Sequence, residues 1–346
     1  MKNIYLIVLA FMLTACTFGD KYQHADTFSL DDFKEVKELE GKTLEFDSLI
    51  MQPSELRVFD SLLITITYNC EKRLHIFDLK TRKQINQCLL KGQGPHEMLQ
   101  PHFIGNDKSK VVLFDAATSK VLEYELTDLL KSSSPVPSRQ TQLQQKIFIC
   151  ANQLGSKLLG CSHQPDHQIY TFDWNGILQN KSIPYPTSSI SYSDVEKVDA
   201  YYMRFTTNEK DKLALCYCMT DLIEIYRQNG TLIKRLQGPD HFFTYFKEVH
   251  RGKVVTSSPD TERLRDAYFS PGNMGDSFGV LYNGNKPMDK SYSFLCKELF
   301  SFSWEGVPQT RYLLSEGIFV WDIDTKHCKI YGISNSPEYH IVEYHY

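Results

Sequence analysis

The chain of 346 residues has a formal net charge of -4 at pH 7, and 42% of its residues are hydrophobic and 13% aromatic. Nucleic-acid binding needs a clustered basic surface, and no long run of one charge occurs, so the composition gives no reason to expect nucleic acid as a partner. The length alone suggests about two domains, but the repeats described below would share one continuous core and predict a single domain.

The N-terminus has the pattern of an export signal. Lys2 is followed by an apolar run over residues 4–13, which is too short to span a membrane but typical of a signal-peptide core. The run ends in Leu13-Thr14-Ala15-Cys16, which resembles the bacterial lipobox. In that class of signals the peptide is cut before the cysteine, whose sulfur carries a diacylglycerol. The resemblance implies a signal peptide over residues 1–15 and lipid attachment at Cys16; an ordinary signal peptide with a chance cysteine is the alternative.

A lipid-anchored exported chain of this kind implies a cell envelope, and we expect an outer-membrane lipoprotein. Surface-exported lipoproteins of some Gram-negative groups carry acidic residues just after the cysteine, whereas only Asp20 stands in the residues directly after Cys16. Both a periplasmic and a surface-facing position therefore stay open. Residues 16–41 are expected to form a polar tether, with a charged and helix-compatible patch over residues 30–40.

A short strand pattern recurs six times in the rest of the chain. Each copy is rich in aromatic and branched residues, which suit a pleated sheet. The copies lie at residues 74–78, 121–124, 168–173, 222–226, 299–304 and 341–344. A pattern that repeats at intervals of one blade predicts a β-propeller. The longest interval falls in blade five, where an irregular insert is expected over residues 257–275.

The ends of the chain are predicted to meet in the last blade. Blade six supplies only three strands, at residues 318–321, 329–333 and 341–344. A first strand around residues 43–46 is the best candidate for the missing fourth, because pairing the two ends closes the ring and removes an exposed edge. The prediction is an all-β, six-bladed β-propeller over residues 42–346. A two-layer sandwich is the alternative, but it does not explain the repeated hairpins.

One loop carries a family resemblance. Gly92-Gln93-Gly94-Pro95-His96-Glu97 is similar to the G-x-G-P-x-E signature that follows the first blade in TolB-like six-bladed propeller lipoproteins of gut-type Gram-negative bacteria. Residues 330–335 and 341–344 also resemble the last blade of that family. The resemblance covers nearly all of the mature chain and implies the six-bladed fold and an envelope address. The family is largely uncharacterised, so the resemblance implies little about activity. His96 stands where a glycine is common in that family, which makes the loop bulkier.

Two blade-to-blade loops hold candidate ligand residues. The loop above follows blade one, and Gln237-Gly238-Pro239-Asp240-His241 is expected in the same place after blade four. Because such loops ring one mouth of a propeller, His96, Glu97, Asp240 and His241 are the candidates for a ligand rim. Tight turns use the same glycines and prolines, and the turn interpretation is favoured. The G-K-[ST] ending of a phosphate-binding loop is missing.

Other motifs give no catalytic, metal or cofactor site. Gly275-Asp276-Ser277-Phe278-Gly279 matches a nucleophile pattern, but that pattern works only between a strand and a helix in an α/β sheet. His163 and His167 flank Pro165, which excludes a regular helix, and no further ligands are evident. Trp174, Trp304 and Trp321 fit hairpin and core packing better than sugar stacking. We therefore predict no metal and no cofactor.

Eight cysteines follow Cys16, and an oxidising compartment would permit disulfides between them. Cys150 and Cys161 are placed symmetrically about a turn at Gly155-Ser156, so they could face each other across a hairpin and are the one candidate disulfide. Buried free thiols are expected for the others.

The sequence leaves three functions open. The first is a lipid-anchored envelope propeller that binds a partner protein or a small ligand. The second is an envelope hydrolase or lyase with its site in the propeller funnel, and the third is a glycan-binding accessory lipoprotein. Histidine and carboxylates gathered at the axis would favour the enzyme, whereas an apolar or plugged axis with a broad aromatic patch would favour partner binding.

Overall fold

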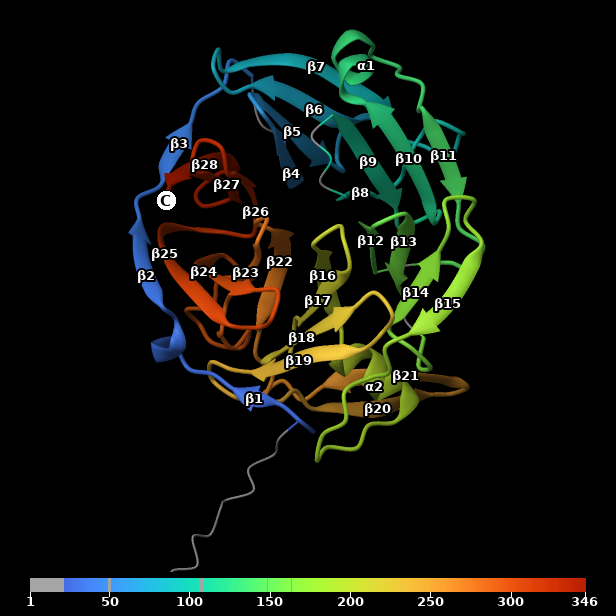
Figure 1. Ribbon diagram of the computed structural model, residues 1–346, viewed down its shortest axis with the longest axis vertical. Helices are drawn as coiled ribbons and strands as arrows, with labels where there is room; N and C mark the ends of the chain where they lie inside the picture. The colour runs from blue at the N-terminus through green and yellow to red at the C-terminus, as the bar shows by residue number, and fades with distance from the viewer. Residues whose placement is uncertain (1–21, 49–50, 106, 108, 148, 163) are drawn as a thin grey trace, which may run out of the picture.

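The computed structural model describes residues 22–48, 51–105, 107, 109–147, 149–162 and 164–346. The expected signal peptide and Cys16 lie outside the described residues. In the described part the predicted fold is confirmed, because six mainly antiparallel sheets stand as blades around one axis (Figure 1). None of the described helices is long and apolar enough to cross a membrane.

The first three blades have four strands each. Blade one consists of β4 (Pro53–Phe59), β5 (Leu62–Thr67), β6 (Lys72–Asp78) and β7 (Lys83–Leu90). Blade two consists of β8 (Pro101–Ile104), β9 (Lys110–Asp115), β10 (Lys120–Glu125) and β11 (Arg139–Gln142), with helix α1 (Leu126–Lys131) before its last strand. Blade three consists of β12 (Cys150–Leu154), β13 (Lys157–Cys161), β14 (Ile169–Phe172) and β15 (Leu178–Ser182).

The N-terminal segment runs along the outside of the other three blades. Blade four contains β16 (Met203–Thr207), β17 (Lys212–Tyr217), β18 (Leu222–Arg227), β19 (Leu232–Gln237) and, parallel to β19, β1 (Asp26–Thr27). Blade five contains β22 (Tyr268–Asn273), β23 (Ser277–Tyr282), β24 (Cys296–Ser303), β25 (Pro308–Ile318) and, parallel to β25, β2 (Glu35–Leu39). Blade six contains β26 (Val320–Asp324), β27 (Lys329–Ser334), β28 (His340–His345) and β3 (Lys42–Leu44).

The predicted ring closure is confirmed. β3 pairs antiparallel with β28, with Thr43 opposite Val342, so an N-terminal strand completes the last blade. The prediction of a tether over residues 16–41 is wrong for residues 22–41, and the expected helical patch is a 3-10 turn (Leu30–Asp32) followed by strand β2. The physical reason is packing: the Phe33 ring centroid lies 4.8 Å from that of Phe300, and Phe28 and Phe33 are buried against blade five.

The apolar core lies between the blades. Each pair of neighbouring blades encloses one cluster of buried side chains, so a strand such as β9 is buried on both faces. In the cluster between blades one and two, for example, Ile64 and Ile76 meet Leu113 and Leu122. This explains why apolar runs such as Val111–Phe114 do not alternate with polar residues.

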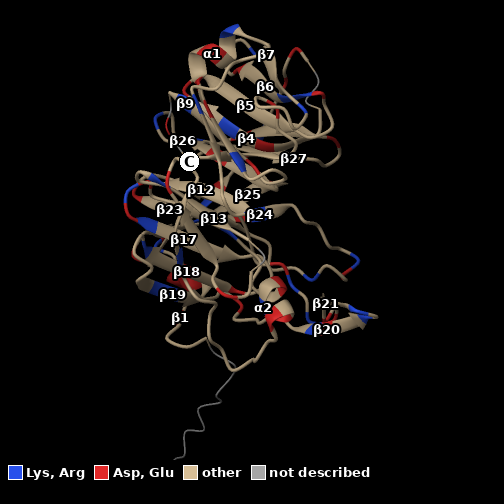
Figure 2. Ribbon diagram, turned by 90° about the vertical axis from the view of Figure 1, so that its right-hand side faces the viewer, with Lys and Arg blue, Asp and Glu red and all other residues tan. Residues whose placement is uncertain are grey.

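Two insertions stand on the face where the chain passes from one blade to the next. Helix α2 (Asp194–Ala200) lies between blades three and four, and the hairpin β20 (Phe246–Arg251) and β21 (Val254–Pro259) lies between blades four and five. The hairpin projects beside α2 (Figure 2). The insert predicted over residues 257–275 is therefore misplaced, since residues 268–273 form the inner strand β22.

Candidate functional site

The six innermost strands surround a cavity of about 430 Å³ on the propeller axis. They are β4, β8, β12, β16, β22 and β26, which contact one another in ring order. Most lining side chains come from the first half of these strands, so the cavity lies toward the face that carries the insertions. A pocket in which polar groups from every blade converge is the default binding-site hypothesis.

A histidine and a carboxylate meet at the wall formed by blades one and two. His102 Nδ1 lies 2.5 Å from Glu55 Oε1, and the Phe103 backbone N–H donates to Glu55 Oε2 at 2.9 Å. Burial alone would raise the pKa of Glu55, but His102 and the Phe103 N–H hold it below its usual value. In the described part of the chain, His102 Nε2 has no hydrogen-bond partner, so this ring nitrogen is available to a group bound in the cavity.

A second charged pair joins blade one to blade six. Asp322 Oδ2 accepts the Val58 backbone N–H at 2.7 Å and lies 3.8 Å from Arg57 Nε. The Arg57 guanidinium also donates to the Gly105 carbonyl and lies over the Phe103 ring, 5.5 Å from its centroid. Both charges are thus held by protein groups at the cavity wall.

Arg204 in β16 is the second arginine of the lining, and its surroundings differ from those of Arg57. Its guanidinium donates through Nη1 to the Ile149 carbonyl and lies 5.5 Å from the centroid of the Tyr202 ring. Burial would lower the pKa of Arg204, but nearby groups, foremost Cys150 and Tyr202, raise it, so the side chain stays charged. Among the described residues no carboxylate forms an ion pair with it, which leaves a half-buried cation facing the cavity.

The candidate disulfide lies at the same wall. Cys150 and Cys161 are direct cross-strand neighbours in β12 and β13, and both are free, buried thiols in the structure. Burial raises the pKa of Cys150, but a hydrogen bond with Cys161 and the charge of Arg204 outweigh it and lower the pKa, while that of Cys161 is raised. The disulfide stays a prediction: when protein from the native envelope is denatured and alkylated without reduction, this pair should stay unlabelled, and labelling of both would contradict it.

The tryptophans serve packing, as the sequence favoured. The Trp321 Nε1–H donates to the Ser270 carbonyl at 2.7 Å, and its ring is buried against Gly272 and Gly279, where an added Cβ would come within 3.0 Å. Trp304 is also buried, and its Nε1–H donates to the Gly275 carbonyl. The partly exposed rings at the axis are instead Phe103, Tyr202, Phe269 and Phe319.

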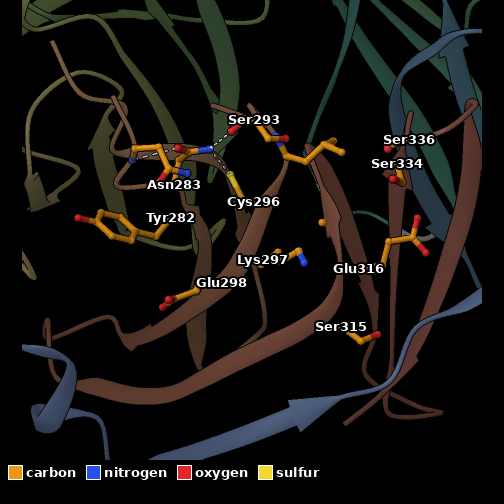
Figure 3. A pocket seen from close by; sticks show the side chains of 13 residues that line it. Tyr282, Asn283, Ser293, Cys296, Lys297, Glu298, Ser315, Glu316, Ser334 and Ser336 are labelled. Carbon is orange, nitrogen blue, oxygen red and sulfur yellow. Dashed lines mark hydrogen bonds between the residues drawn. The ribbon is translucent and has the colours of Figure 1, made fainter. Parts of the chain in front are cut away.

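A second cavity, of about 540 Å³, lies between blades five and six (Figure 3). It is larger, but its carboxylates are occupied by neighbouring side chains. Glu298 accepts both Nε and Nη2 of Arg311, at 2.8 and 2.9 Å, and Glu316 lies 2.5 Å from His340 Nε2. Ion pairs account for these acidic groups, as they do for Glu55 and Asp322 at the axis. The second cavity takes its lining from two blades only, whereas all six blades converge on the axial cavity, which is therefore the better functional candidate.

The first predicted rim loop is a closed turn. The Glu97 carboxylate accepts the Gly94 N–H at 2.8 Å, and the Lys120 ammonium donates to the carbonyls of Gly94 and Glu97 at 2.8 and 2.6 Å. A Cβ at Gly92 would lie 1.9 Å from Glu97 Oε2, so the glycine makes room for this carboxylate. His96 is exposed beside the turn and does not line the axial cavity.

The second predicted rim loop lies three blades away, on the opposite side of the ring. Asp240 accepts from Arg265 and from the Tyr282 hydroxyl, and His241 Nε2 lies 3.0 Å from the Phe28 carbonyl oxygen. The structure therefore keeps Asp240 and His241 together but separates them from His96 and Glu97, and none of the four lines the axial cavity. A shared rim site built from both loops is not formed.

A buried carboxylate beneath the second loop predicts a pH effect. Asp221 Oδ2 accepts the N–H groups of Asp240 and His241 at 2.7 Å each, whereas Oδ1 has no hydrogen-bond partner in the described structure. Burial raises the pKa of Asp221 to about 7, although the two N–H groups lower it. An unfolded aspartate titrates near pH 4, so the folded state holds an extra proton between about pH 4 and 7.

The free energy of unfolding should therefore lose a contribution on the order of 4 kcal/mol from this group as the pH rises from about 4 to 7. Asp221→Asn keeps the acceptor oxygen but cannot ionise. The free energy of unfolding of this variant, relative to that of the native protein, should therefore increase as the pH rises from about 4 to 7. Urea unfolding at a series of pH values measures the difference. The exposed Asp211→Asn is the control, and a difference that is constant with pH would refute the assignment.

A model described as TolB-like 6-blade propeller-like matches residues 32–326 of the chain, most of its length. The chain belongs to this family. The resemblance seen in the signature loop and the last blade is thereby confirmed. No match to this TolB-like propeller was found among the curated proteins.

Two solved structures show the same fold as this TolB-like propeller at low identity. A member of the DUF4221 family from Bacteroides vulgatus is 8% identical, with a TM-score of 0.52, over 94% of this chain and 97% of that one. A protein of Bacteroides fragilis described as exported is 13% identical, with a TM-score of 0.50, over 92% and 99% of the two chains. At these identities the likeness concerns the fold alone.

Sequence reasoning missed the axial residues of this TolB-like propeller. Glu55, Arg57, His102, Arg204 and Asp322 all stand in the first strand of their blades. The usable signal was a charged side chain in the first strand of a blade, where burial near the axis demands a partner or a ligand. No group of three or more potential metal ligands occurs among the described residues.

Proposed function

We propose that this protein is a lipid-anchored envelope propeller that binds a ligand in its axial cavity. The observation that carries the proposal is the convergence of side chains from all six blades on one cavity, with a guanidinium, Arg204, that lacks a carboxylate partner among the described residues. Propellers commonly serve as binding modules, with the site where the inner strands meet.

Filling the cavity tests this proposal. Ala151 lines it from β12, so Ala151→Trp should block it and remove binding of any ligand recovered from a glycan and peptide screen. Ser315→Trp fills the cavity between blades five and six and serves as the matched control. Calorimetric titration of both variants decides: binding that survives in Ala151→Trp but is lost in Ser315→Trp would place the site elsewhere.

The proposed anchor and address rest on the lipobox-like residues before Cys16 and on the family. In a Gram-negative host, Cys16→Ser should move the protein from the membrane fraction to the soluble fraction and abolish incorporation of labelled fatty acid. Cys328→Ser, at an exposed cysteine of the propeller, is the control and should change neither. Protease accessibility on intact cells distinguishes a surface-facing from a periplasmic protein.

An envelope hydrolase or lyase is the second candidate, because His102 and Glu55 lie in the same cavity. Glu55 orients the imidazole through Nδ1, so Nε2 can act as a general base or acid toward a bound substrate. His102→Gln should then abolish turnover of the substrate without abolishing its binding. His327→Gln is the control, since His327 forms a similar pair with Asp324, at 2.6 Å, outside the cavity. Binding with no turnover in the native protein would reject the enzyme.

The hairpin β20–β21 is the feature that favours an additional protein partner. Both of its outer edges are unpaired among the described strands, and its tip exposes Val254 and Val255 beside Arg251 and Lys253 (Figure 2). Unpaired edges can accept a strand from another chain. Replacing Val255 by Pro would remove a backbone N–H donor from this edge. The variant should capture an envelope partner more weakly, and its ligand binding in the axial cavity should be unchanged.

A further inference from the structure

Arg204 is a cation in the axial cavity whose hydrogen-bonding groups are largely unused. A guanidinium has five N–H donors, and the described structure gives this one a single acceptor, the Ile149 carbonyl. Holding a charge away from water without a partner is unfavourable, so the site gains most from a ligand that brings a negative charge. The planar arrangement of the donors suits a carboxylate bound through both oxygens.

The two carboxylates of the cavity do not cancel this preference. Glu55 is engaged by His102 and by the Phe103 N–H, and Asp322 by the Val58 N–H. Glu55 is close enough to Arg204 for its charge to help raise the pKa of the guanidinium, but it forms no ion pair with Arg204 in the described structure. Arg204 is the cation that remains for a ligand.

The rest of the lining suits a sugar ring. Phe103 and Tyr202 are partly exposed in the lining and bring aromatic surface to the apolar C–H groups of a sugar, although a guanidinium lies over one face of each ring. Hydroxyl and amide groups line the same cavity. These polar groups belong to Ser54, Asn152, Thr206 and Asn273. A cavity of about 430 Å³ lies within the range usual for small ligands.

The aromatic surface continues out of the cavity. The Phe319 ring in the lining lies 5.8 Å from the ring of Phe294 and 6.4 Å from that of Tyr339. Phe294 is 47% exposed and Tyr339 37%, and with Phe319 between them they form a continuous aromatic surface of the kind that marks a binding site. A chain of sugars could thus lie with one unit in the cavity and the next on these rings.

We propose that the ligand is an acidic glycan, with the carboxylate of one hexuronic acid unit bound by Arg204 and the following units on Phe319, Phe294 and Tyr339. This inference rests on the proposed function and narrows it to one ligand class. It assigns the charge recognition to a single side chain, so it can fail while ligand binding in the axial cavity stands.

The experiment is calorimetric titration of the full chain in non-ionic detergent. The probes are galacturonic acid and its tetramer, their methyl esters, galactose, galactose 6-sulfate and a neutral-capped tripeptide with a free carboxylate. The tetramer should bind best, and its methyl ester about 10- to 100-fold more weakly, because the ester loses charge-assisted hydrogen bonds. Raising the salt concentration should weaken the acid but not the ester.

Variants assign the effect to residues. Arg204→Met should weaken the acidic tetramer by about 10- to 100-fold and leave the weak binding of the methyl ester unchanged. Arg204→Lys keeps the positive charge but loses the planar set of N–H donors. Its affinity for the acidic tetramer should therefore lie between those of the native protein and Arg204→Met. Arg227→Met, at an exposed arginine on β18, is the matched control, and equal melting temperatures show that the variants are folded. Tyr339→Ala should weaken the tetramer but not the monomer.

Each other outcome overturns the inference in a distinct way. Equal affinity for the acid and its ester, or preference for the sulfate or the tripeptide, would leave an axial binding site with a different ligand class. If the acidic tetramer binds equally to the native protein and to Arg204→Met, a residue other than Arg204 recognises its charge. If no probe binds and Ala151→Trp changes no ligand recovered by screening, the proposed function itself fails.

Discussion

A chain that begins at Phe46 should fail to form a stable propeller, although every strand of blades one to five that is recognisable in the sequence would still be present. The truncation removes β1, β2 and β3, and with them the strand that pairs with β28 and closes blade six. It also removes the buried side chains Tyr22, Phe28, Phe33, Leu39 and Leu44.

The expected loss is comparable to the whole stability of a domain. Burying one large apolar side chain contributes about 1.5–3 kcal/mol, so the five together contribute roughly 8–15 kcal/mol as an upper estimate. Folded proteins are stable by about 5–15 kcal/mol in total. Circular dichroism melting and gel filtration should therefore show a non-cooperative, associating protein, since the open edge of β28 can also pair with other chains.

A chain that begins at Tyr22 is the matched control and should melt like the mature protein. Adding a peptide of residues 22–45 to the shorter chain should restore part of the cooperative transition, because its contacts are non-covalent. A truncated chain with an unchanged, cooperative melting curve would show that the N-terminal strands are dispensable for closure.

Arg235→Met should destabilise the protein by about 3–5 kcal/mol, because it leaves a buried carboxylate without a counter-charge. Glu224 is fully buried in blade four, and its Oε1 lies 2.5 Å from Arg235 Nε. The Tyr217 hydroxyl lies 2.6 Å from Oε2, and Arg235 also donates to the Gln23 carbonyl in the N-terminal segment. The loss should appear as a lower urea midpoint with an unchanged slope.

The exposed pair Arg227 and Asp211 supplies the comparison. These side chains are 54% and 53% exposed and 3.8 Å apart, so Arg227→Met should change the free energy of unfolding by less than about 1 kcal/mol. The double variant Glu224→Gln with Arg235→Met removes the unpaired charge and should recover part of the loss. Equal destabilisation by the two arginine variants would show that Glu224 does not need the counter-charge of Arg235.

The sequence by itself determined the architecture, because short local patterns predict the strands and turns of each blade. Aromatic and branched strands followed by turn residues recur in every blade, and the hairpin at Asn175-Gly176 has the left-handed glycine that its dipeptide predicts. The three-strand count of blade six was enough to require a strand from the other end of the chain. The G-x-G-P-x-E loop identified the family.

The tertiary structure alone decided where irregular segments belong. β22 contains Pro271 and Gly272, which argue against a strand locally, but a bulge there and the Trp321 ring packed on Gly272 hold it at the axis. β2 reads as a charged segment, because an edge strand on the outside of a blade buries few of its side chains.

The candidate site also depended on the tertiary structure. Glu55 and His102 are 47 positions apart in sequence and touch only because β4 and β8 are neighbours in the ring. In the sequence, Arg204 cannot be told from other arginines in strands. Only the described structure shows that no carboxylate forms an ion pair with it. The strands of each blade lie close together in sequence, so local patterns predict them. A site on the axis takes one or two residues from each blade, and no local pattern indicates which of these residues converge.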